Sequence, residues 1–292
     1  MNSKIVAESG PLLPFLFSKW PEVKRTKIKQ WLRFGAVNVN DHIITQHDYQ
    51  LQLRDVVSIR PQKAPPPGSQ LPAGLSVAYE DEELLVIVKP VNLLTVATEN
   101  ERDKTAFHIM TDYLRRRGSS SHDRLWIVHR LDRETSGLIV MAKSEKSKLW
   151  LQANWTRMEK RYLAVVEGVM PKAENTLTGF IDESQLHRVF ASDHATSKTR
   201  EATMHYRVLR ENKSRSLLEV TLESGRRHQI RAQLAAAGCP IVGDKKYGAS
   251  ANPIKRIALH ASYLKLLHPK DERELFFESP LPDDVARLAP CS

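Results

Sequence analysis

The sequence predicts an α+β protein in which a small N-terminal domain precedes a larger domain, built on a mixed, largely antiparallel sheet with helices flanking a cleft. The chain has 292 residues, more than one small domain usually holds. Prolines and glycines crowd residues 61–74, which predicts a linker between domains of residues 1–60 and 75–292. Beyond the linker, strand-like runs often follow one another directly, as is typical of antiparallel pairing.

The first 60 residues predict a helix pair followed by a β-hairpin. Helices are expected at Leu12–Phe17 and Lys24–Phe34, and Gly35 suits the left-handed residue that often ends a helix. Valines alternate with asparagines at 37–39, and a second apolar run at 56–59 predicts the closing strand.

The larger domain shows six strand-like runs and three helical patterns. Strands are predicted at Leu84–Val88, Trp126–His129, Leu138–Ala142, Tyr162–Glu167, Thr203–Leu209 and Leu217–Leu222. Helices are predicted at Ala106–Arg116, Ser144–Arg157 and Arg231–Ala237, the last of them ended by Gly238.

Composition narrows the function classes. Forty-four Lys and Arg against 34 Asp and Glu give a formal charge of +10, which favours a polyanionic partner such as RNA, although a basic protein without nucleic acid has the same balance. The two cysteines, Cys239 and Cys291, lie far apart and form no zinc-ligand pattern. We see no leader peptide and no membrane span, so we expect a cytoplasmic protein without a bound metal.

One loop carries the first candidate for chemistry. Residues 129–137 read His-Arg-Leu-Asp-Arg-Glu-Thr-Ser-Gly between two apolar runs, and reactive groups often occupy such loops. The carboxylate of Asp132 would stay ionised among Arg130, Arg133 and His129, and an ionised, partly desolvated Asp can act as a nucleophile. A surface loop of ion pairs is the alternative.

Two further segments contain candidate binding groups. Residues 223–231 follow a strand and lead into a helix, so that several donors converge where an anion binds favourably; a solvated basic helix start is the alternative. Tyr162 begins a strand that follows basic residues, where it is either half-buried core or a platform that stacks on a base.

Together these segments resemble the RluA-type pseudouridine synthases. That family's hallmark, His-Arg-Leu-Asp, two variable residues and Thr-Ser-Gly, matches His129–Gly137 without a gap. Further matches follow in order from about residue 77 to 280: Lys89-Pro90 with Leu93-Leu94, the Tyr162 strand, Gly225-Arg226 with His228–Arg231, Gly238, Pro240-Ile241, Gly243-Asp244 with Tyr247-Gly248, Leu259–Ala261 and His268-Pro269.

The sequence departs from the family pattern at three places. Asn92 stands where the family usually has Gly, and Arg227 replaces a small Thr or Ser, which adds a possible phosphate contact. The front 60 residues resemble a small RNA-binding domain first seen in a ribosomal protein, but Leu53-Arg54 replaces its common Pro-Gly turn.

The resemblance implies an isomerase that converts specific uridines of ribosomal or transfer RNA to pseudouridine, as a monomer without cofactor. It implies that Asp132 is the nucleophile, that Arg231 is its ion-pair partner, and that Tyr162 stacks on the flipped base. Arg130 would reach into the space that the flipped base leaves, or toward nearby phosphates, and Leu259 would form an apolar wall of the pocket. Further RNA contacts are expected from Arg226, Arg227, His228 and Gln229, and in the front domain from Lys24, Arg25, Lys27 and Lys29.

Several alternatives stay open. Asp132 could attack the sugar, attack the uracil ring, or assist an elimination, and all three routes need the same carboxylate. The protein could instead be an inactive RNA-binding protein, or an N-glycosidase that releases uracil. The sequence does not indicate which uridine or which RNA is modified.

Overall fold

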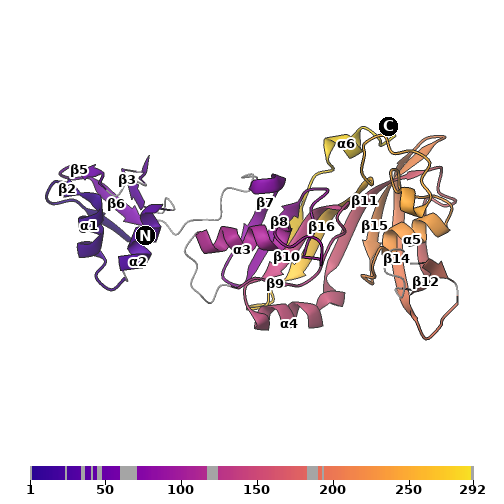
Figure 1. Cartoon of the computed structure of the whole chain (residues 1–292), viewed down its shortest axis with the longest axis horizontal. Helices are drawn as coiled ribbons and strands as arrows, with labels where there is room; N and C mark the ends of the chain where they lie inside the picture. The colour runs from indigo at the N-terminus through magenta and orange to yellow at the C-terminus, as the bar shows by residue number, and fades with distance from the viewer. Residues whose placement is uncertain are drawn as a thin grey trace. The chain divides into compact units, whose positions relative to one another are not determined.

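Strands are the main regular elements of this chain. The computed structural model (Figure 1) describes residues 2–23, 25–33, 37–40, 42–44, 48–59, 71–116, 124–182, 190–192 and 194–290. It divides into two compact units, which we call the N-terminal unit (residues 1–69 with 110–124) and the large unit (residues 70–109 with 125–292). The domain boundaries at residues 60 and 74 stay a prediction.

The N-terminal unit combines two helices with short strands. Its elements are β1 (Asn2–Ile5), β2 (Gly10–Pro11), α1 (Leu12–Lys19), α2 (Arg25–Arg33), β3 (Val37–Val39), β4 (His42–Ile43), β5 (Gln50–Leu51) and β6 (Val56–Ile59). Four of the strands pair in the order β1-β6-β3-β4. Apolar side chains of both helices, among them Leu16 and Ile28, pack with the valines of β3 and β6 in one buried core. Both helices lie where the sequence places them, α1 two residues longer than predicted, while Lys24, Phe34 and Gly35 lie outside the described residues.

The large unit is built on one sheet of eleven strands. Its strands are β7 (Ser76–Glu80), β8 (Leu84–Lys89), β9 (Trp126–Ile127), β10 (Ser136–Ala142), β11 (Glu159–Glu167), β12 (Glu174–Asp182), β13 (Phe190–Ser192), β14 (Thr199–Glu211), β15 (Arg215–Leu222), β16 (Leu259–Leu267) and β17 (Glu274–Glu278). They lie in the order β13-β12-β14-β15-β11-β16-β10-β8-β7, with β17 on β16 and β9 on β10. The predicted mixed, largely antiparallel sheet is therefore confirmed.

A parallel pair of strands, β10 and β16, fixes the position of the loop that precedes β10. Among the described strands only β10 and β16 run parallel, with Gly137 opposite Ala261. Ala261 is in turn opposite Tyr162 on β11, where a β-bulge follows Arg161. The loop that ends in β10 is thereby held one strand away from Tyr162.

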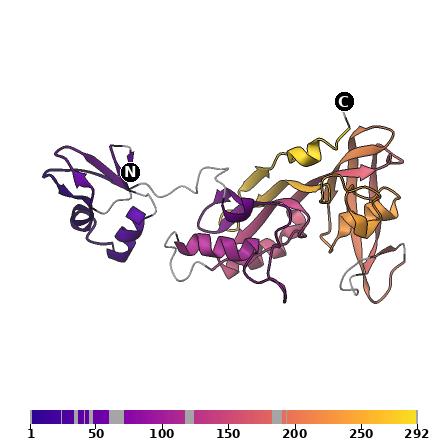
Figure 2. The same ribbon diagram turned by 45° about the horizontal axis from the view of Figure 1, so that its top comes forward.

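Few helices cover the sheet. Those of the large unit are α4 (Glu145–Ala153), α5 (Gln229–Ala236) and α6 (Asp283–Ala286), with 3-10 turns η1 (Pro72–Gly74), η2 (Trp155–Arg157) and η3 (Lys245–Tyr247). Helix α3 (Ala106–Arg116) begins in the large unit and continues into residues of the N-terminal unit. Leu151 of α4 packs with β8, β10 and β16, whereas Leu234 of α5 joins a second core with β11, β14 and β15. In the turned view, α5 lies beside the orange strands (Figure 2). Among the described residues, no helix is both long and apolar enough to cross a membrane.

The structure corrects three predicted elements. The strand expected at Trp126–His129 ends at Ile127. The helix expected at Ser144–Arg157 ends at Ala153, because Asn154 leaves helical geometry before η2; Ser144 caps its start by accepting a hydrogen bond from the Ser147 amide. The end of the linker, expected to lack helix, forms η1, since a proline presets the first turn. The linker residues 61–70 lie outside the described residues.

Two departures from the family pattern have a common geometry. Asn92 and Arg54 both have left-handed backbone, with φ of 63° and 71°. Glycine adopts this conformation without strain, and Asn is among the side chains that tolerate it best. Asn92 can therefore replace the usual glycine without a change of the local backbone.

Candidate active site

The Asp132 loop is fixed by backbone hydrogen bonds to neighbouring segments. It connects β9 to β10, as the sequence predicted. The Thr95 hydroxyl donates to the Leu131 carbonyl (2.7 Å) and accepts from the Leu131 amide (3.1 Å). The Thr135 amide donates to the Asp132 carbonyl (3.2 Å). Both sides of Asp132 are thus held, which limits the positions that its carboxylate can take.

The partner of the Asp132 carboxylate is Arg231 of α5. Arg231 Nη1 donates to Asp132 Oδ2 at 3.0 Å, and the arginine side chain is only 4% exposed. Its remaining nitrogens bind Asp244, from Nε to Oδ2 at 2.7 Å and from Nη2 to Oδ1 at 3.0 Å. Burial opposes the charge of Arg231, but these two carboxylates outweigh it and raise its pKa. Arg231 therefore stays charged and presents one N–H group to Asp132.

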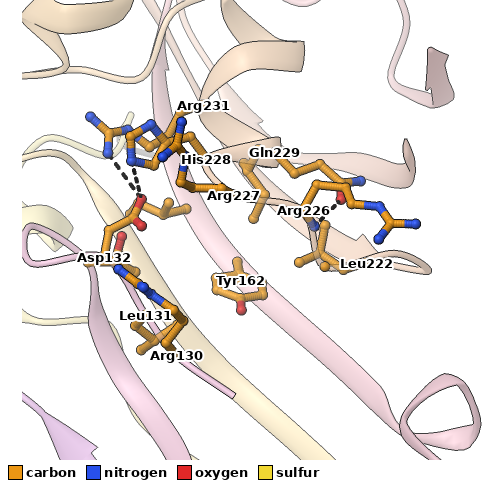
Figure 3. A pocket seen from close by; sticks show the side chains of 14 residues that line it. Arg130, Leu131, Asp132, Tyr162, Leu222, Arg226, Arg227, His228, Gln229 and Arg231 are labelled. Carbon is orange, nitrogen blue, oxygen red and sulfur yellow. Dashed lines mark hydrogen bonds and ion pairs between the residues drawn. The ribbon is translucent and has the colours of Figure 1, made fainter. Parts of the chain in front are cut away.

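A cavity of about 300 Å³ opens in front of this ion pair (Figure 3). Asp132 and Thr135 line it from the loop, Tyr162 from β11 and Leu259 from the start of β16. Tyr162 lies in the middle of the pocket view, on the β11 ribbon. The pocket thus combines the Asp132 carboxylate, the Tyr162 ring and apolar walls.

The hydroxyl of Tyr162 remains protonated at neutral pH. Burial raises its pKa, and the nearby charge of Asp132 raises it further. A phenol in this state cannot act as an anionic base. Its oxygen can take up a proton only if the hydroxyl gives its own proton to another group in the same step.

Arginines surround the pocket from two sides. Arg130 lies on the Asp132 loop and is exposed, while Arg226 and Arg227 precede α5, and all three line the cavity. Arg226 Nε also donates to the Glu201 carbonyl at 3.2 Å. Three guanidinium groups near one cavity suit a ligand that carries phosphates.

Gln229 lines the cavity, but its side chain is engaged within the protein. It is 2% exposed, and its Oε1 accepts from the Ser224 hydroxyl (2.9 Å) and the Arg226 amide (3.1 Å). Its Nε2 donates to the Thr203 carbonyl at 3.0 Å. These bonds brace the turn before α5, so Gln229 orders the arginines rather than reaching out to a ligand.

The expectation that His129 supplies positive charge beside Asp132 is wrong. Its Nε2 accepts a hydrogen bond from the Val140 amide (3.1 Å), and its ring stacks 4.7 Å from that of Trp155. Burial lowers the pKa of His129 to about 3, and the charge of Lys160 lowers it further. His129 is a neutral, half-buried residue that ties the loop to β10.

Sequence reasoning assigned no role to Lys89, which lies beneath the loop. Its side chain is fully buried, and Nζ donates to the carbonyls of Pro90 and Leu93 (2.8 Å each) and of Arg133 (3.3 Å). Burial lowers the pKa of Lys89 to about 7, against the opposing effect of the Asp132 charge. The three carbonyls match the three donors of an ammonium group. Lys89 thus joins β8 to the loop beside Asp132.

Two other residues also lacked a predicted role. Asp244 holds Arg231, and Tyr247 at the end of η3 contacts His228. Both belong to the family motif Gly243-Asp244 with Tyr247-Gly248. The sequence therefore marked these positions, but it did not show which residues they contact. Among the described residues, no group of three or more His, Cys, Asp or Glu could hold a metal ion.

The basic residues predicted in the N-terminal unit are only partly described. Arg25 and Lys29 are exposed on α2, and the Arg25 guanidinium lies 5.2 Å from the ring of Phe17. Lys24 lies outside the described residues, as does the side chain of Lys27.

Comparison with known proteins identifies the family. Residues 83–236 match the model of the family described as "RNA pseudouridylate synthase". The chain is 32% identical over 283 residues to the "Uncharacterized RNA pseudouridine synthase YlyB" of Bacillus subtilis, covering 94% of this chain and 91% of that protein. It is 31% identical to the "Ribosomal large subunit pseudouridine synthase D" of Nitrosomonas europaea, covering 92% of this chain and 80% of that protein.

A solved structure shares the fold. "Human RNA Pseudouridylate Synthase Domain Containing 4" superposes with a TM-score of 0.60 at 23% identity, covering 73% of this chain and 90% of that one. The matched family segment contains Asp132, Tyr162 and Arg231, the three residues that meet at the cavity. This chain therefore belongs to the RNA pseudouridylate synthase family, whose members are isomerases that act on RNA.

Proposed function

We propose that this protein converts particular uridines of large-subunit ribosomal RNA to pseudouridine, with Asp132 as its essential carboxylate and without a cofactor. The observation that carries the proposal is the Asp132–Arg231 pair at the mouth of a cavity that also contains Tyr162 and Leu259. Relatives named for the large ribosomal subunit support the choice of RNA. The reaction rearranges atoms without net redox change, so it requires no nicotinamide, metal or ATP.

The reaction begins when the target uridine leaves its stack and enters the cavity. Tyr162 and Leu259 then hold the uracil, and Arg130 occupies the space it leaves or binds a neighbouring phosphate. Arg226 and Arg227 bind further phosphates around the pocket. These roles suit the chemistry of each side chain, because aromatic rings stack on bases and guanidinium forks bind phosphate.

Asp132 then acts while the bond between ribose and uracil nitrogen breaks. Both described contacts of its carboxylate fall on Oδ2, and among the described residues Oδ1 has no hydrogen-bond partner. Oδ1 is therefore the oxygen available for the sugar, for the uracil ring or for a proton. The detached base turns, its carbon five joins the sugar, and that carbon loses its hydrogen.

Replacement of Tyr162 separates stacking from proton transfer. Tyr162→Phe keeps the ring and is expected to bind RNA normally, but to slow the removal of hydrogen from carbon five on the order of tenfold or more. Tyr162→Ala is expected to weaken RNA binding as well, by about 1–3 kcal/mol, because the stacking ring is removed. Single-turnover rates and RNA dissociation constants would check both. Equal binding and equal rates in the two variants would show that Tyr162 is only a core residue.

We also propose that residues 1–60 supply RNA affinity rather than chemistry, and that the protein acts as a monomer. Replacing Lys24, Arg25, Lys27 and Lys29 by Ala is expected to raise KM more than it lowers kcat. It should also make RNA binding less sensitive to salt. The slope of the logarithm of the binding constant against the logarithm of salt concentration should become shallower by up to about 0.7–0.9 for each phosphate that these side chains no longer neutralise.

The size of that effect should depend on the RNA. It should be largest on long structured RNA and small on a short stem-loop that cannot reach both units, because a second binding site raises the effective concentration. Melting temperature serves as a control, since Arg25 also packs near Phe17. An unchanged salt slope with unchanged kinetics would assign these residues to a solvated surface.

The substrate is tested by mapping pseudouridine in cells with and without the gene. A carbodiimide that reacts stably with pseudouridine marks each modified position as a stop in reverse transcription. We expect one or a few positions in large-subunit ribosomal RNA to remain unmodified without the gene. An effect on transfer RNA alone would keep the activity but overturn the proposed substrate.

A further inference from the structure

The side chain of His228 lies between Asp132 and a buried tyrosine. His228 precedes α5 with left-handed backbone (φ 54°), a conformation for which His is among the more tolerant residues. Its Nδ1 lies 2.9 Å from the hydroxyl of Tyr247. Its Nε2 lies 3.6 Å from Asp132 Oδ2, the oxygen that Arg231 also contacts. In Figure 3 a dashed line joins the imidazole to this carboxylate.

The imidazole of His228 is neutral at neutral pH. Burial lowers its pKa to about 4 against the opposing effect of the Asp132 charge, and the charges of Arg231, Lys246 and Arg227 lower it further. A neutral imidazole carries a hydrogen on one nitrogen and a lone pair on the other. The neighbours of the ring therefore decide whether Nε2, the nitrogen that faces Asp132, carries the hydrogen.

Only one of the two tautomers suits both neighbours. With the hydrogen on Nδ1, the Nε2 lone pair would face the negative oxygen of Asp132. With the hydrogen on Nε2, that N–H points toward the carboxylate, and Nδ1 needs a donor. The Tyr247 hydroxyl can donate to it, whereas a phenylalanine at this position could not.

A single short segment supports both residues that contact Asp132. Tyr247 ends η3 and is 5% exposed, and its ring lies 5.2 Å from the Arg231 guanidinium. Asp244, directly before η3, binds Arg231 through two hydrogen bonds. The segment 244–247 therefore holds Arg231 at one end and His228 at the other.

We propose that Tyr247 is a positioning residue whose hydroxyl donates to Nδ1 of His228 and so directs the Nε2 hydrogen of that imidazole toward Asp132. The inference rests on the proposed role of Asp132. The separation of 3.6 Å is longer than a hydrogen bond, and catalytic contacts of this kind often shorten once substrate binds. His228 then becomes a second donor to the carboxylate, independent of Arg231.

A double-mutant cycle tests whether Tyr247 acts through His228. Tyr247→Phe removes only the hydroxyl and keeps the ring beside Arg231. With a large-subunit ribosomal RNA transcript, it is expected to lower the single-turnover rate on the order of tenfold, the effect of removing one charge-assisted hydrogen bond, while the RNA dissociation constant changes less than about twofold. His228→Asn suits the left-handed backbone but is too short to reach Asp132, and should cost at least as much.

The decisive comparison is Tyr247→Phe in the His228→Asn background. We expect less than about a twofold further decrease there, because the route to Asp132 is already broken. His228→Gln, which can place an amide N–H near the position of Nε2, should restore part of the rate and should also be insensitive to Tyr247→Phe. An equal decrease in every background would overturn the inference and make the hydroxyl a structural group.

A second measurement does not depend on the RNA. Nitrogen NMR of the protein labelled with ¹⁵N-histidine reports which ring nitrogen carries hydrogen, and the His228→Asn spectrum identifies the signals of His228. We expect hydrogen on Nε2 in the wild type and a mixture in Tyr247→Phe. Hydrogen on Nδ1 in the wild type would overturn the inference. If the wild-type protein leaves the transcript unmodified, the proposed substrate fails, and this spectrum still decides the tautomer.

Discussion

Replacing Asp132 by Asn is expected to lower the single-turnover rate of pseudouridine formation on the order of a thousandfold or more. The change is isosteric, and it removes the negative charge and the nucleophilic oxygen together. Folding should be nearly unaffected, because Arg231 keeps its two hydrogen bonds to Asp244 and is not left as an unpaired buried charge. We expect the free energy of unfolding to change by less than about 1 kcal/mol.

Asp244→Asn is the matched control for this experiment. It removes the carboxylate that holds Arg231 from the buried side, so it should reduce both stability and activity. Urea unfolding, RNA binding and single-turnover kinetics of the two variants would be compared. If Asp132→Asn kept more than about a tenth of the wild-type rate, Asp132 could not have its assigned role.

Replacing Gly137 by Ala is expected to destabilise the large unit by about 3 kcal/mol or more and to abolish activity. A Cβ at this position would lie 2.2 Å from the carbonyl oxygen of Ala261 and 2.6 Å from its nitrogen. Both atoms belong to the backbone of β16, so β10 and β16 would have to separate. Because Ala261 also pairs with Tyr162, the shift would move the Asp132 loop away from the aromatic ring.

Gly238→Ala separates crowding from backbone strain. Gly238 also has positive φ (81°), but a Cβ there meets nothing within 4 Å. Its replacement should therefore cost only the strain of the left-handed conformation, about 1–2 kcal/mol. Thermal unfolding of both variants would measure the difference. Equal destabilisation at the two glycines would show that the close approach of β10 and β16 is unimportant.

The sequence predicted those elements whose apolar pattern is strong. The helix Ala106–Arg116 has the predicted bounds, and β8, β10 and β15 extend the predicted runs by only a few residues. Strand β12 was missed because its side chains are mostly exposed or half-buried, so that few apolar residues alternate along it. Strand β16 was missed because its first residues, Leu259–Ala261, were treated as a motif rather than as the start of a strand.

The site could be predicted only where a motif named its residues. Local charge reasoning placed Arg130, Arg133 and His129 around Asp132, because they are neighbours in sequence. The structure instead brings Arg231 to the carboxylate across 99 positions, and a composition or periodicity pattern carries no signal for such a contact. Asp244 acts through Arg231, and Tyr247 acts through His228. Their contribution therefore depends on packing that only the fold defines.

The most direct test of the account uses purified protein and RNA that carries tritium on carbon five of uridine. Formation of pseudouridine replaces that carbon–hydrogen bond, so we predict release of tritium to water, with no free uracil and no change in RNA mass beyond the exchanged hydrogen. Asp132→Asn should release none. Release of free uracil would identify an N-glycosidase, and tight RNA binding without any tritium release would identify an inactive RNA-binding protein; either result would contradict the account.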